Sequence, residues 1–66
     1  MDFNIEQKSL IYSLIYNQKI SRVAVIRRLL KLKSIEIKEN HSIIDDAVKK
    51  LCKMTDQEYI EYDFEV

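Results

Sequence analysis

The 66-residue sequence contains no glycine and no proline, and its only cysteine is Cys52. Without glycine and proline, the chain has no ready phosphate-cradling loop, no cis-proline turn and no flexible linker. A lone cysteine excludes an internal disulfide, and no cysteine–histidine spacing is present that could hold a structural metal. We therefore expect no metal and no cofactor. We expect Cys52 to be a small buried hydrophobe of a protein in a reducing compartment.

Long hydrophobic runs are also missing. The longest run, LIYSLIY at residues 10–16, is far shorter than the roughly 18 apolar residues that span a bilayer. The N-terminal sequence MDFNIEQK is acidic and polar, unlike a secretory signal peptide. These observations predict a cytoplasmic protein with no membrane partner.

Groups that could carry out catalysis are scarce. The one histidine, His41, lies in the polar stretch KENHS, and no nucleophile is spaced to meet it. Asp45 and Asp46 are adjacent, and neighbouring positions on a helix point about 100° apart, so these carboxylates do not face each other. We therefore expect a protein that is not an enzyme and has no catalytic residues.

The net charge of zero hides an asymmetry along the chain. Residues 1–38 contain eight Lys or Arg and three Asp or Glu, which gives +5. Residues 39–66 contain three Lys and eight Asp or Glu, which gives −5. A protein that holds nucleic acid by charge alone is usually basic overall. The two halves can instead neutralise each other, or present opposite charges to partners.

The sequence pattern predicts a predominantly α-helical fold with one small domain over residues 1–66. Helices are expected at about 4–16, 21–33 and 42–54, followed by an extended acidic-aromatic tail at 55–66. Asn4, Ser21 and Ser42 are candidate N-caps, Asp45 completes a capping box with Ser42, and Thr55 opens a short helical turn before the tail. The alternative is an α+β fold, in which residues 34–38 and 59–66 pair as two strands because both alternate apolar and polar residues.

The first predicted helix is apolar over most of its circumference and is expected to end near Asn17 in a left-handed conformation. A helix of this kind requires neighbours on more than one side, and two other helices in so small a domain leave part of it uncovered. We expect the uncovered part to contact a protein partner or a second copy of the chain. The candidate residues of this partner or dimer face are Ile11, Tyr12, Ile15 and Tyr16.

The second predicted helix divides into two faces on a helical wheel. The wheel assigns aliphatic residues to the core, namely Val23, Ile26, Leu29 and Leu30, with Val25 and Leu32 at the margin. The opposite face carries a basic stripe, defined as Arg27, Arg28 and Lys31. This stripe is the second candidate partner-binding site.

The same segment, ISRVAVIRRLL at residues 20–30, resembles the second helix of helix-turn-helix repressors. The resemblance implies DNA binding, with groove-facing positions at Ser21, Arg22, Val23, Ile26, Arg27 and Leu30. The sequence departs from the family at Lys19, where glycine is usual, and at Ile15, where a small residue is usual. Because the wheel places three of the six groove-facing positions in the core, any contact with nucleic acid would use the basic stripe on phosphates.

The predicted tail carries three aromatic anchors, Tyr59, Tyr62 and Phe64, interspersed with acids. Such a segment can add as a strand to a sheet edge or meet a basic surface. Together these features predict a small regulatory or inhibitory protein that binds a protein partner, either alone or as a homodimer, of the kind common in phages and mobile elements. A helix-turn-helix-like DNA-binding regulator is the alternative, and a structural subunit of a larger assembly is the third interpretation.

Overall fold

The computed structural model describes residues 2–18, 20–36 and 38–65. In these residues the helices are α1 (Ile5–Ile15), α2 (Arg22–Ile35), α3 (His41–Lys53) and α4 (Asp56–Glu61), and the 3₁₀ turn η1 (Lys38–Asn40) precedes α3. The predicted predominantly α-helical fold is confirmed, with α4 as a fourth helix beyond the three that were expected. The two-stranded alternative is wrong, because the described part of residues 34–38 and 59–66 contains no strand and includes the ends of α2 and α4. Ile37 and Val66, which that alternative included, lie outside the described residues, as does Lys19.

Side-chain caps fix the starts of three helices where the sequence predicts them. Asn4 Oδ1 accepts the backbone N–H of Gln7 at 2.8 Å, and Gln7 Oε1 accepts the N–H of Asn4 at 3.1 Å. Thr55 and Glu58 form the same reciprocal capping box at α4, and Ser21 caps α2. Each of these bonds satisfies a backbone N–H that has no partner within its helix. The predicted helical start at Thr55 is confirmed. The prediction of an extended tail over residues 55–66 is wrong for its first half, because residues 56–61 form the helix α4, and the chain becomes extended at Tyr62.

The start of α3 differs from the prediction. Asn40 is the N-cap and makes no side-chain cap bond, so Ser42 lies inside the helix and the predicted capping box with Asp45 does not form. The Asp45 carboxylate instead meets Lys33 Nζ of α2 at 2.7 Å. An ion pair between α2 and α3 therefore replaces the capping box within α3 that the sequence pattern favoured.

The described part of the connection from α1 to α2 contains no left-handed residue. Tyr16 ends α1 in the right-handed helical region, and none of the described residues has a positive φ. The prediction of a left-handed Asn17 is therefore wrong. Just after α1, the Gln18 N–H donates to the Ile15 carbonyl at 3.3 Å.

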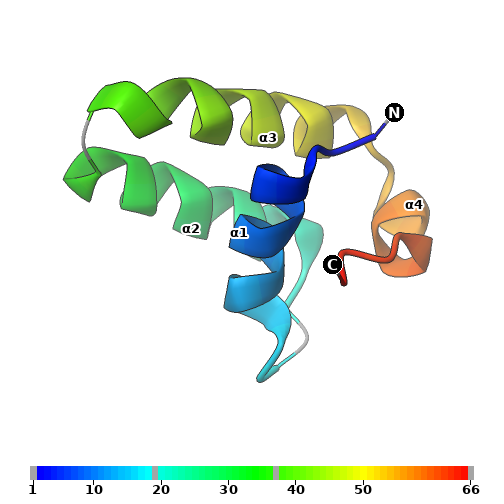
Figure 1. Ribbon diagram of the computed structural model, residues 1–66. Coiled ribbons are helices and arrows are strands. Elements are labelled where there is room, and N and C mark those ends of the chain that lie inside the picture. The colour runs from blue at the N-terminus through cyan, green and yellow to red at the C-terminus, as the bar shows by residue number, and fades with distance from the viewer. Residues whose placement is uncertain (1, 19, 37, 66) are drawn as a thin grey trace.

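The helices are arranged as an antiparallel pair with a third helix across it. Helices α2 and α3 run side by side in opposite directions, and α1 lies across one face of this pair (Figure 1). Helix α4 sits at the end of the pair where α3 finishes, and the N- and C-terminal segments lie near each other there (Figure 1). None of the described helices has both the length and the hydrophobicity needed to cross a membrane.

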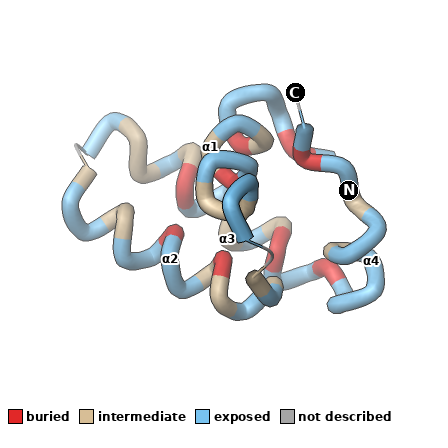
Figure 2. The backbone as a smooth tube through the Cα atoms, turned by 90° about the horizontal axis from the view of Figure 1, so that it is seen from below, coloured by how far each residue is buried: buried red, intermediate tan, exposed pale blue. Residues whose placement is uncertain are grey.

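The buried residues gather where α1, α2 and α3 meet and beneath the tail (Figure 2). They are Phe3, Ile11, Val25, Leu29, Ile44, Ala47, Leu51, Met54 and Phe64. Cys52 follows Leu51 on α3 but points elsewhere and is exposed, so its predicted burial is wrong. Adjacent positions on a helix face directions about 100° apart, and the core lies on the Leu51 side.

The buried side of α2 differs from the side that the helical wheel selects. Val25 and Leu29 are fully buried, whereas Val23 is 47% exposed and Leu30 is 48% exposed. Aliphatic residues occur almost all round α2, so the pattern within the helix does not define one apolar stripe. Contacts with α1 and α3 decide which side is buried, and they bury the side of Val25. The assignment of Val23 and Leu30 to the core is therefore wrong.

Candidate functional site

Helix α2 contains five basic residues and no acidic residue. Two of the five are paired with the acidic half of the chain. Arg22 Nε lies 2.9 Å from Asp56 Oδ1, and Lys33 Nζ lies 2.7 Å from Asp45 Oδ1. At these two points, basic residues of the first half of the chain and acidic residues of the second half neutralise each other within the molecule.

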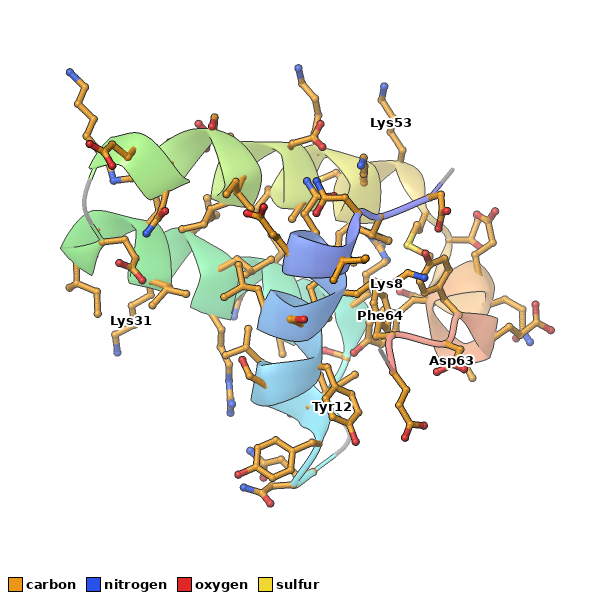
Figure 3. All side chains as sticks on the ribbon, viewed as in Figure 1. Lys8, Tyr12, Lys31, Lys53, Asp63 and Phe64 are labelled. Atoms are coloured by element: carbon orange, nitrogen blue, oxygen red, sulfur yellow. The ribbon has the colours of Figure 1, made fainter. Side chains whose placement is uncertain are left out.

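The other three basic residues form the predicted basic stripe, and all three are exposed. The side chains of Arg27, Arg28 and Lys31 make no ion pair or hydrogen bond with any residue that the structure describes. Lys31 points away from the body of the molecule, on the side of α2 opposite α3 (Figure 3). Three positive charges are therefore available at the surface of one helix.

Three exposed aliphatic residues of α2, Val23, Leu30 and Ile35, accompany these cations, and Val23 and Leu30 lie closest to Arg27 along the helix. Positions 23, 27, 30 and 34 follow one another at steps of four, three and four, so they lie along one line of the helix. All four are exposed. We define the basic-aliphatic face of α2 as Val23, Arg27, Arg28, Leu30 and Lys31. It is a mixed surface, in which apolar and positively charged groups are neighbours.

The aliphatic members of this face were missed from the sequence because the wheel assigned them to the core. A signal that could have found them is the resemblance to helix-turn-helix repressors. Of the six groove-facing positions that it implies, four are exposed, namely Ser21, Val23, Arg27 and Leu30. The other two, Arg22 and Ile26, are half-buried.

The predicted tail anchors pack inside the molecule. Phe64 is 3% exposed, and its ring centroid lies 4.5 Å from that of Tyr62 and 5.3 Å from that of Phe3. The half-buried Tyr59 donates its hydroxyl to the Ile20 carbonyl at 2.7 Å, and burial raises its pKa. Because these rings hold the tail against the domain, Phe64 is not presented to a partner in this conformation.

Tyr62 links the tail to the N-terminal segment. Its hydroxyl hydrogen-bonds to the Asp2 carboxylate and also accepts the backbone N–H of Phe3 at 3.2 Å. Burial, and secondarily the bond to Asp2, raise the pKa of Tyr62, while the same bond lowers the pKa of Asp2. The polar groups at the edge of the aromatic cluster therefore also have hydrogen-bond partners within the chain.

The predicted partner face of α1 is only partly exposed. Ile11 is fully buried and Ile15 is half-buried, whereas Tyr12 and Tyr16 are exposed, with ring centroids 6.2 Å apart. A shallow groove of about 420 Å³ runs beside these two tyrosines. Its lining residues are Ser9, Tyr12, Ser13, Tyr16 and Glu65. Of the four residues predicted for the partner face of α1, only Tyr12 and Tyr16 are therefore exposed.

A second, mostly apolar groove of about 490 Å³ lies where α4 and the tail meet the start of α2. Its apolar lining residues are Ile15, Ile20, Tyr59, Ile60, Tyr62 and Phe64. Arg22 and Asp56 stand at this groove, but they are paired with each other. Among the groove-lining residues that the structure describes, the two charged side chains therefore neutralise each other.

The described residues hold no cluster of three His, Cys, Asp or Glu side chains that could bind a metal ion. His41 is half-buried, with its ring Nε2 3.2 Å from the Glu36 carbonyl oxygen. In the described part of the chain, every buried side-chain nitrogen or oxygen has a hydrogen-bond partner. The charged groups of the described residues that have no ion pair therefore lie at the surface, and they include the three cations of the basic-aliphatic face. Comparisons of the chain with protein-family models, curated proteins and solved structures found no match.

Proposed function

We propose that this protein is a small, non-enzymatic regulatory or inhibitory protein that acts by binding another protein through the basic-aliphatic face of α2. The observation that supports this most is the exposure of Val23 and Leu30 on the same line as Arg27. Single exposed aliphatic residues are common on protein surfaces. Two of them beside unpaired cations provide both apolar contact area and charge complementarity, as protein interfaces do.

The composition of the face favours a protein over a phosphate backbone. Phosphates are held by cations and polar groups, which position a protein on nucleic acid. Val23 and Leu30 would gain little from such a contact, whereas the apolar part of a protein surface would bury both. The whole chain also has no net positive charge to attract nucleic acid at long range.

Affinity capture from the native host tests this function. The immobilised full-length chain is compared with its Arg27→Glu and Leu30→Ser variants. Two matched controls change exposed residues elsewhere, Lys53→Glu on α3 and Ile60→Ser on α4. We expect a protein that is recovered with the unchanged chain and both controls, and that is reduced at least tenfold with each variant of the face. Equal recovery with all five chains would show that this face is not the binding site.

A DNA-binding regulator is the second candidate. The observation in its favour is the exposure of Ser21, Val23, Arg27 and Leu30, which the resemblance places toward the groove. Titration of duplex DNA at two salt concentrations separates the candidates. Micromolar or tighter binding that falls steeply with salt and is lost on changing Arg27 and Arg28 to alanine would favour DNA, because release of counterions makes phosphate contacts strongly salt-dependent.

The cytoplasm is the compartment that we propose for this activity. Cys52 is an exposed free thiol in the structure. Exposed thiols persist where glutathione and thioredoxin keep them reduced, and they tend to form intermolecular disulfides in oxidising compartments. Labelling of Cys52 with a thiol reagent immediately after cell lysis tests the proposal, and we expect full labelling without prior reduction.

A further inference from the structure

We propose that the segment of the partner that binds α2 is an acidic amphipathic α-helix lying along the basic-aliphatic face. Its apolar side chains contact Val23 and Leu30, and its carboxylates meet Arg27, Arg28 and Lys31. This inference rests on the proposed function and goes further, because it states the chemistry and the secondary structure of the occupant.

The spacing of the exposed residues favours a helix as the occupant. Steps of four, three and four between positions 23, 27, 30 and 34 are those of the contact line between paired helices. The line covers about 16 Å of α2 at 1.5 Å per residue, so a partner helix of about three turns matches it. Ser34 Oγ donates to the Lys31 carbonyl at 2.6 Å, which turns this hydroxyl back onto its own helix and leaves a small contact position. A partner strand has no matching site, since the described residues offer no sheet edge.

The charge of the face requires an acidic occupant. Helix α2 contains no acidic residue, and the two basic residues that flank the face, Arg22 and Lys33, are already paired. Arg27 lies between Val23 and Leu30 on the contact line, so an opposing carboxylate would sit between two apolar contacts. A charge-assisted hydrogen bond in that position is partly shielded from water and is stronger than one at an open surface.

A second copy of the chain fits this face poorly. Pairing α2 with α2 would bring Arg27, Arg28 and Lys31 close to the same cations of the other copy, and like charges oppose such an interface. The acids of α4 do not provide a substitute, because α4 has six residues and its carboxylates have partners. Asp56 pairs with Arg22, Glu58 accepts the Thr55 N–H, and Glu61 accepts from Gln57. The chemistry of the face therefore points to a different protein.

Three synthetic peptides of 21 residues test the inference against the isotope-labelled full-length chain. The first is a monomeric helix with leucines at the a and d positions of each heptad and glutamates at e and g. The second has the same composition in shuffled order, without an apolar stripe. The third has lysine in place of every glutamate. Binding is measured by fluorescence anisotropy, and the contact site is mapped from backbone amide chemical shifts.

We expect the first peptide to bind at least tenfold more tightly than the other two and to shift the amides of residues 22–35 most strongly. Leu30→Glu should weaken this binding at least tenfold, because it places a carboxylate against the glutamates of the peptide. Ile60→Glu is the matched control, since Ile60 is 70% exposed and lies on α4, and it should leave the affinity unchanged. Circular dichroism of both variants verifies that the helices are retained.

Four outcomes would overturn the inference. They are equal binding of the shuffled peptide, shifts centred on Tyr12 and Tyr16, absence of binding by the first peptide, and displacement of that peptide from α2 by duplex DNA at equal concentration. The affinity-capture experiment described above tests the proposed function separately. If Arg27→Glu abolishes capture while the peptides fail, α2 binds a protein by another geometry. If capture is unaffected, both proposals are wrong.

Discussion

Arg22, at the start of α2, is held by Asp56, at the start of α4, with Nε and Oδ1 2.9 Å apart. The same guanidinium donates through Nη1 to the Leu51 carbonyl near the end of α3, at 3.0 Å. A positive charge in the first turn opposes the dipole of α2, while a negative charge at the start of α4 favours the dipole of that helix. One arginine side chain therefore connects three helices.

Replacing the two partners should have unequal effects on stability. Arg22→Met should lower the free energy of unfolding by about 1–2 kcal/mol, because the Leu51 carbonyl loses its side-chain donor as well. Asp56→Asn should cost less than about 1 kcal/mol, since the carboxylate is largely exposed. Urea denaturation checks both values, with Arg28→Met as a control on the exposed side of α2. An Asp56→Asn effect as large as that of Arg22→Met would contradict this description.

Gln7 should be more important for stability than any exposed residue of α1. It is buried, its Oε1 accepts from Lys50 Nζ at 2.9 Å, and its Nε2 donates to Asp46 Oδ2 at 2.7 Å. The Gln7→Leu variant removes these bonds and leaves the Lys50 ammonium and the Asn4 N–H without this partner. We therefore expect the free energy of unfolding to fall by about 2–3 kcal/mol. Thermal unfolding should show a correspondingly lower midpoint. Ser9→Ala, on the exposed side of α1, should change the midpoint little.

The carboxylate of Asp46 should make stability depend on pH in the acid range. Hydrogen bonds from Gln7 and then from Lys50 lower its pKa in the folded protein. A carboxyl whose pKa is lower in the folded than in the unfolded state stabilises the fold fully above its unfolded value of about 4, and this contribution is lost as the pH falls through the folded value. Urea titrations between pH 7 and pH 2 should show this loss. In the Asp46→Asn variant, the free energy of unfolding should fall less over this pH range. An unchanged fall would mean that other carboxyl groups cause the pH dependence.

Phe64 should behave as a core residue although it lies in the tail. Phe64→Ala removes a ring that packs against Phe3, Tyr59 and Tyr62, and we expect a loss of about 3 kcal/mol. The near-ultraviolet circular dichroism of the tyrosines should weaken at the same time. The neighbouring exposed change, Glu65→Ala, serves as the control. A tail that is free to bind as an extended peptide would instead tolerate the loss of Phe64.

Features that depend on local sequence were predictable. The caps at Asn4, Ser21 and Thr55 each require a suitable side chain within three residues of the N–H that it accepts, so the sequence around each helix start contains the needed information. The all-α fold follows from these caps and from the helical period between them. Of the two acid–lysine pairs that lie four residues apart on α3, Asp46–Lys50 is present at 3.0 Å, whereas Asp45 pairs with Lys33 of α2.

Features that depend on which helices meet were not predictable in the same way. Val23 and Val25 are two residues apart on α2, and the chemistry of their side chains is identical. Only the positions of α1 and α3 bury one and expose the other, so the aliphatic part of the candidate binding face could not be read from the wheel. The burial of Gln7 has the same origin, since Asp46 and Lys50 of α3 supply the partners of its amide.

The contact of Phe3 with Tyr62 and Phe64 has a consequence for biosynthesis. The hydrogen bond from the Phe3 N–H to the Tyr62 hydroxyl joins residues 59 positions apart, near the opposite limits of the domain. Helices α1, α2 and α3 are synthesised before residues 62–64, and this aromatic contact cannot form until residues 62–64 have been added and have left the ribosome. At about 5–20 residues per second, a nascent chain exposes Phe3 for several seconds before its covering arrives. During that interval Phe3 lacks the covering of Tyr62 and Phe64, and the N-terminal segment is open to chaperones and to non-native contacts.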